Sequence, residues 1–156
     1  MNKKIVLALG GNALGNTPTE QAEAVKITAK SIVNLVEQGN QVLIVHGNGP
    51  QVGMIYNAFD LASKDNDKIP SLSLALSGAM SQGYIGLHLQ QAINTELKHK
   101  KIDKQVLTVI TQTKVSADDP AFSKPTKPIG SFMTEQEAKQ VAKATGSSVG
   151  EDSGRG

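Results

Sequence analysis

Two apolar segments of this chain each end in glycine and asparagine, residues whose amide groups can bind an anion. They are Gly10, Gly11 and Asn12 after the first segment, and Gly47, Asn48 and Gly49 after the second. Neighbouring parallel strands of an open α/β sheet bring their carboxyl ends to one crevice, where such sheets bind ligands. Backbone N–H groups in turns of this kind form anion sites. We therefore expect these six residues to bind a small anion.

The glycine spacing fits neither of two common phosphate-binding loops. A dinucleotide fingerprint has glycines at its first, third and sixth positions, whereas Gly10, Gly11 and Gly15 occupy the first, second and sixth. A Walker-type loop needs a lysine where Asn16 stands. The alternative is that the glycines only turn the chain after each strand. Repetition of Gly-Asn at two strand ends favours a binding role.

The elements that must position these turns alternate between strand and helix, which predicts right-handed parallel crossovers. Capping sequences mark two helix starts, and glycines mark the ends. Glycines at 78, 83 and 86 predict close packing of the longest helix against a neighbouring helix or subunit. The predicted elements are strands over 3–9, 41–45 and 105–111, and helices from Pro18 to just before Gly39, over 51 to about 63, over 72–97, and from 135 to Gly146.

Composition limits the classes of protein to which the chain can belong. Its 156 residues include three Phe, two Tyr and no Trp, so the core must be aliphatic, as in a buried parallel sheet. A net charge of +2 without basic clusters argues against nucleic acid as a partner. The sequence has no cysteine and no apolar run long enough for a membrane helix, so we expect a soluble, cytoplasmic protein.

Five segments resemble the carbamate kinase family, within the amino acid kinase fold. They are residues 8–13, 46–53, 81–86, 125–130 and 151–156. The resemblance implies an α/β fold, a three-layer αβα sandwich with a mainly parallel sheet. In that fold residues 1–113 form the carbamate lobe and 114–150 a small protruding lid subdomain. Residues 151–156 would begin the return to a nucleotide-binding lobe that this chain lacks.

Enzymes of that family transfer a phosphoryl group reversibly between carbamoyl phosphate and ADP, giving ATP and carbamate. The resemblance implies that the six strand-end residues bind carbamate or carbamoyl phosphate, and that Lys127 acts in catalysis from the lid. Backbone N–H groups beside Gly11 and Gly49 would stabilise the transferring phosphoryl group. The resemblance also implies a homodimer. It implies that Mg²⁺ binds together with ATP or ADP on the nucleotide side, so we expect no metal ligands in this chain.

Family members are about twice as long as this chain, as an added domain requires. We therefore expect the chain to carry the carbamate side only and to be inactive alone. Two alternatives stay open. One is a related kinase acting on a carboxylate such as acetylglutamate or aspartate, against which the lid sequence 125–130 argues. The other is a non-catalytic lobe that binds an anion or a partner chain.

Overall fold

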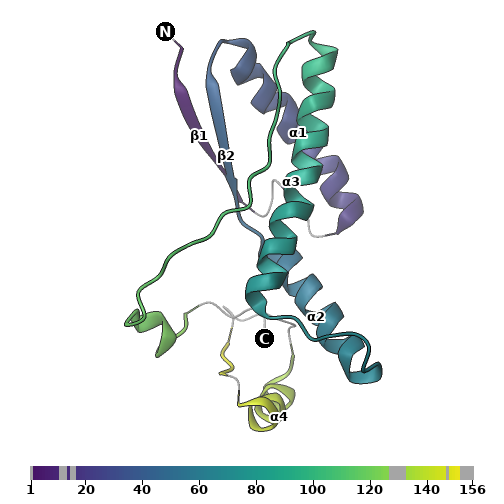
Figure 1. Ribbon diagram of the computed structural model, residues 1–156, viewed down its shortest axis with the longest axis vertical. Coiled ribbons are helices and arrows are strands. Elements are labelled where there is room, and N and C mark those ends of the chain that lie inside the picture. The colour runs from purple at the N-terminus through teal and green to yellow at the C-terminus, as the bar shows by residue number, and fades with distance from the viewer. Residues whose placement is uncertain (1, 11–13, 15–16, 127–132, 147, 152–156) are drawn as a thin grey trace.

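β1 (Lys4–Leu9) and β2 (Gln41–His46) form a parallel pair, as the strand–helix order predicts. The computed structural model describes residues 2–10, 14, 17–126, 133–146 and 148–151. The other elements are α1 (Pro18–Glu37), α2 (Gly49–Asp65), α3 (Leu74–His99), the 3-10 helix η2 (Pro120–Phe122) and α4 (Glu135–Thr145) (Figure 1).

Local sequence signals set the limits of α1, which crosses from β1 to β2. The Thr17 hydroxyl accepts a hydrogen bond from the backbone N–H of Glu20 at 3.2 Å, and Pro18 begins the helix. Gly39 follows the helix with φ of +87°, a conformation that few residues other than glycine adopt. The helix therefore begins and ends where the sequence predicts.

The hydrophobic core lies between one face of the sheet and the helices α1 and α3 (Figure 1). α1 packs against α3, and both cover the side of the strands that carries alternate residues such as Leu7 and Ile44. At the far end of this pair, the Lys100 ammonium donates to Asn34 Oδ1 at 2.8 Å and tethers α3 to α1. Buried core residues of the two helices are Val25, Ala29, Ile32, Val33, Ile85, Leu89, Ile93 and Leu97.

The opposite face of the sheet is apolar and exposed. Val6 and Leu43 are 64% and 61% exposed, and Val45 lies on the same face.

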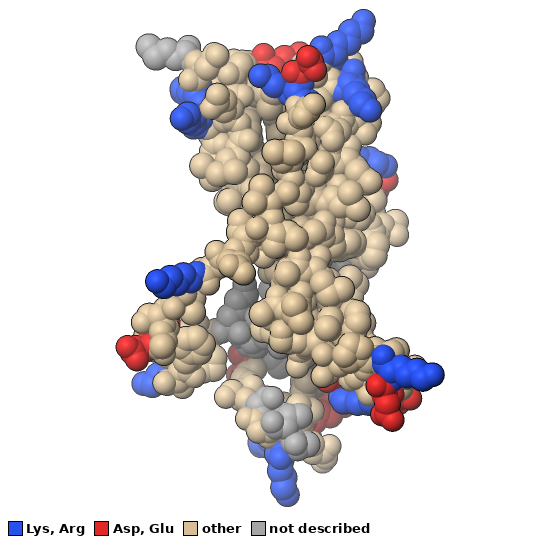
Figure 2. All heavy atoms as spheres, in the orientation of Figure 1, with Lys and Arg blue, Asp and Glu red and all other residues tan. Residues whose placement is uncertain are grey.

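Charged side chains gather at the two ends of the molecule on the side seen in Figure 2, and few lie in the middle band. The described residues thus supply the paired strands and a layer of helices on one side of them.

The predicted third strand, 105–111, is not formed. These residues run extended beside α3, but among the described residues only β1 and β2 pair as strands (Figure 1). Side chains of α3 take the place of a strand partner: Gln82 bonds both the N–H and the carbonyl oxygen of Thr111, and Gln90 accepts from the Thr108 hydroxyl. β-branched residues favoured an extended backbone here, but a strand also needs an adjacent edge in register.

Close packing explains why position 86 of α3 is a glycine. A Cβ at this buried position would lie 2.1 Å from Cγ2 of Thr108, so the extended segment packs directly on the helix backbone. A Cβ at Gly78 or Gly83 would meet no atom of the described residues within 4 Å. Close packing is therefore found at one of the three glycines, and its partner is the extended segment at Thr108 instead of the neighbouring helix or subunit that the sequence led us to expect.

Beyond residue 112 the chain leaves the sheet and its helices and forms η2 and α4 (Figure 1). The predicted capping box begins α4, since the backbone N–H and the hydroxyl of Thr134 both donate to the Glu137 carboxylate at 2.8 Å. These two bonds favour the ionised carboxylate and lower the pKa of Glu137. Whether 114–150 acts as a lid stays a prediction.

Candidate functional site

The two glycine turns lie next to each other at one edge of the sheet. Leu9 and His46 are register partners at the ends of β1 and β2, and the N–H of Gly47 donates to the carbonyl oxygen of Leu9 at 3.2 Å. Gly10 and Gly47 therefore continue from adjacent strand ends. The expectation that the two turns share an edge is confirmed for the described part of each.

Neither backbone conformation nor packing explains the glycines at 10, 47 and 49. The described glycines with positive φ are Gly39 and Gly146, so the three strand-end glycines do not adopt the left-handed conformation that glycine favours. A Cβ placed on any of the three would meet no atom of the described residues within 4 Å. The backbone at these positions therefore has room beside it for a closely approaching ligand.

The amino-terminal end of α2 completes this edge. Asn48 precedes the helix, and its carbonyl oxygen accepts from the N–H of Val52 at 2.8 Å. Gly49 and Pro50 form the first turn, so the positive end of the helix dipole lies where β2 ends. Unpaired N–H groups of a first helical turn favour an anion.

The side chain of Asn48 bonds to α3 instead of capping α2. Its Nδ2 donates to Oγ of Ser81 at 2.8 Å, and the Ser81 hydroxyl donates to the carbonyl oxygen of Gly78 at 2.6 Å. Ser81 is completely buried, whereas Asn48 is half-buried. The contact holds the second glycine turn against α3.

His46 stabilises its own turn. Its Nδ1 lies 2.9 Å from the carbonyl oxygen of Gly47, and a carbonyl can only accept, so Nδ1 carries the proton. This contact agrees with a structural role for His46.

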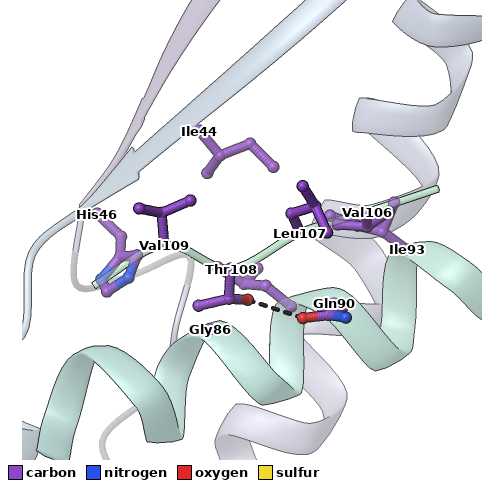
Figure 3. Close-up of a pocket in the computed structure, with 10 residues that line it drawn as sticks. Ile44, His46, Gly86, Gln90, Ile93, Val106, Leu107, Thr108 and Val109 are labelled. Carbon is purple, nitrogen blue, oxygen red and sulfur yellow. Dashed lines mark hydrogen bonds between the residues drawn. The ribbon is translucent and has the colours of Figure 1, made fainter. Parts of the chain in front are cut away.

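A cavity of about 90 Å³ lies on the core side of the same strand end, between β2, α3 and residues 106–109 (Figure 3). Its lining combines aliphatic side chains, such as those of Ile44, Ile93 and Val106, with the polar side chains of His46, Gln90 and Thr108. These polar groups already have partners, since Thr108 bonds to Gln90 and His46 to the Gly47 carbonyl, and the lining residues include no Lys or Arg that would attract an anion. The strand-end turns, and not this cavity, have the chemistry of the candidate site.

Of the residues predicted from sequence, the structure brings Gly10, Gly47, Asn48 and Gly49 to one edge. Gly11, Asn12 and Lys127 lie outside the described residues, so their predicted roles stay predictions. Sequence reasoning did not single out Ser81, which the structure places in contact with Asn48. The segment 81–86 carries part of the family resemblance, but its spacing along the chain gives no sign of contact with Asn48.

Within the described part of the chain, no three His, Asp or Glu side chains come together as metal ligands. None of the described helices combines the length and apolarity needed to cross a bilayer.

The model of the amino acid kinase family matches residues 3–152. The chain belongs to this family. A carbamate kinase-like protein of Escherichia coli is 56% identical over 156 residues, the whole of this chain and 50% of that protein. The carbamate kinase of Staphylococcus epidermidis is 51% identical over 153 residues, which cover 98% of this chain and 49% of the enzyme.

The structure of carbamate kinase from Giardia lamblia bound to AMP-PNP is similar over 99% of this chain and 50% of its own, with a TM-score of 0.84 at 38% identity. The predicted fold class, the amino acid kinase αβα sandwich with its parallel sheet, is thereby confirmed. This amino acid kinase chain spans about half the length of the curated relatives it matches.

Proposed function

We propose that the chain provides the carbamoyl phosphate side of a carbamate kinase. The observation that carries the proposal is the open, uncovered backbone at Gly10, Gly47 and Gly49, on adjacent strand ends and at the start of α2. Similarity to carbamate kinases over almost the whole chain supports this choice over kinases of other carboxylates. A purely non-catalytic role has no specific observation in its favour.

In this proposal the chain works by position and electrostatics. Phosphoryl transfer needs in-line placement of the reacting groups and neutralisation of charge on the phosphoryl oxygens. N–H groups of the strand-end turns and of the first turn of α2 would hold those oxygens as preorganised donors. Each such donor contributes about 3 kcal/mol to lowering the barrier in comparable sites. Carbamate arrives as an anion, so the step needs no general base.

Three predicted parts complete the proposal without being part of the described site. Lys127 would bring a cation over the phosphoryl group from the lid. Gly11 and Asn12 would add donors on the first turn. Mg²⁺ would accompany the phosphates of ATP or ADP and neutralise their charge. The relative from Giardia lamblia is bound to AMP-PNP, which supports a nucleotide as the second substrate.

A homodimer and a cytoplasmic location belong to the same proposal. Exposed apolar residues of α3 support self-association, because they recur on one face of the helix. They are Leu76, Met80 and Leu87, between 46% and 56% exposed.

Calorimetric titration of the chain tests the proposed division between two lobes. We expect weak binding of carbamoyl phosphate, no binding of ATP, and no ATP formation from carbamoyl phosphate and ADP by the chain alone. Tight binding of ATP would contradict the division. Absence of carbamoyl phosphate binding at millimolar concentration would contradict the proposed site.

A further inference from the structure

Ser81 determines which end of the Asn48 carboxamide is free. The carbonyl oxygen of Gly78 can only accept, so the 2.6 Å contact uses the single hydroxyl proton of Ser81. The Ser81 oxygen must then accept from Asn48, and the group 2.8 Å away has to be the Nδ2 amide. The opposite assignment, with Oδ1 at this position, would place two acceptors against each other.

The oxygen Oδ1 of Asn48 is therefore the end turned away from Ser81. It bonds to no described residue and does not cap α2. Asn48 stands between Gly47 and Gly49, in the turn where the proposed substrate binds, and it is only half-buried. An oxygen acceptor repels phosphoryl and carboxylate oxygens. A ligand can bond to it only through an N–H or O–H group.

We propose that Asn48 Oδ1, held in this orientation by Ser81, accepts a hydrogen bond from the amino group of the carbamoyl moiety. The inference rests on the proposed function and adds a basis for specificity to it. Carbamoyl and acetyl phosphate differ by NH₂ against CH₃ and have almost the same shape. A methyl group would leave the acceptor unpaired, and a site built to bond a ligand N–H rejects an analogue without one. Ser81 acts as a positioning residue and Asn48 as the specificity-determining residue.

Two stable analogues test the proposal on the 156-residue chain. Phosphonoacetamide carries the amide of carbamoyl phosphate, and acetonylphosphonate carries a methyl in its place. We expect calorimetry to show about tenfold tighter binding of phosphonoacetamide, the effect of one hydrogen bond. In Ser81→Ala the Asn48 carboxamide is free to rotate by 180°, so that either its oxygen or its nitrogen can face the ligand. The preference for phosphonoacetamide over acetonylphosphonate should then fall below about threefold.

Ser77→Ala is the matched control. Ser77 is also completely buried on α3, but its hydroxyl donates to the carbonyl oxygen of Ser73 at 3.2 Å and not to the chain at Gly78. This variant should keep the tenfold preference. Asn48→Ala should lose the preference, and adding Ser81→Ala to it should change nothing further, because Ser81 acts through Asn48.

Side-chain amide resonances of Asn48 give a readout without ligand. We expect them to shift in Ser81→Ala and to remain in place in Ser77→Ala. Equal binding of the two analogues by the unmodified chain overturns this inference while leaving the proposed function intact. Binding of neither analogue overturns the proposed function together with it. A preference or resonance that Ser81→Ala leaves unchanged rules out the positioning role.

Discussion

At the scale of single residues, the strand-end glycines matter because the protein's own structure does not require them. Gly86 is needed for packing and Gly39 for its backbone conformation. Gly10, Gly47 and Gly49 meet neither condition, so substitutions there separate ligand binding from folding.

Gly49→Ala tests this separation. The new methyl would enter open space at the start of α2, so the free energy of unfolding should change by less than about 0.5 kcal/mol. The same methyl would occupy space beside the N–H groups offered to the anion. We expect phosphonoacetamide to bind at least about tenfold more weakly, the loss of a hydrogen bond or more.

Gly83→Ala is the control for this measurement. Gly83 is also free of neighbours within 4 Å but lies in the interior of α3. Alanine there should stabilise the chain by about 0.5–1 kcal/mol and leave anion binding as it is. Unchanged affinity in Gly49→Ala would mean that the start of α2 does not contact the ligand.

At the scale of elements, α3 supports the candidate site by contacting both Asn48 and the extended segment 105–111. One turn of this helix holds Asn48 through Ser81, and the next presents the bare backbone of Gly86 to Thr108. The extended segment 105–111 has no strand partner among the described residues, so its contact with α3 should be a main source of its order.

Gly86→Ala should destabilise the chain, because the added Cβ cannot coexist with Cγ2 of Thr108 at 2.1 Å. Overpacking of this kind costs about 1–3 kcal/mol, measurable by urea unfolding. Thr108→Ala removes the two nearest obstructing atoms, Cγ2 and Oγ1, and leaves Cβ at 3.1 Å, so the double variant should recover most of the loss. Equal losses in the single and double variants would show that the contact with Thr108 is not the cause.

The elements with local signals were predictable, and those that depend on distant partners were not. Thr17, Gly39 and the capping box at Thr134 act within a few residues, so the limits of α1 and α4 follow from sequence. The segment 105–111 has suitable residues for a strand, but pairing depends on an edge elsewhere in the fold. The Asn48–Ser81 bond joins the turn before α2 to α3, 33 residues further along the chain, and no local sequence signal predicts it.

At the scale of the whole molecule, the exposed face of the sheet stands out. Val6, Leu43 and Val45 lie together on the side opposite α1 and α3. Contiguous apolar surface of this kind marks an interaction site or promotes aggregation. Ile27 on α1 is even more exposed, at 71%, but it belongs to another element away from this face.

Leu43→Thr should therefore reduce binding of a hydrophobic fluorescent dye to the chain and reduce aggregation through this face, which is distinct from the α3 face of the proposed dimer. Because Leu43 is 61% exposed, little burial is lost and stability should change by about 0.5 kcal/mol or less. Ile27→Thr removes a more exposed apolar side chain outside the face and should have little effect on either property. Equal reductions by the two variants would indicate general surface hydrophobicity instead of a defined face.

The parallel register also has a consequence for synthesis on the ribosome. Lys4 pairs with Gln41, so β1 emerges long before the strand that it must join. At roughly 5–20 residues per second, the nascent strand waits a few seconds with its edges unpaired. α1 is made during that interval, and its own N-cap favours its formation before β2 arrives.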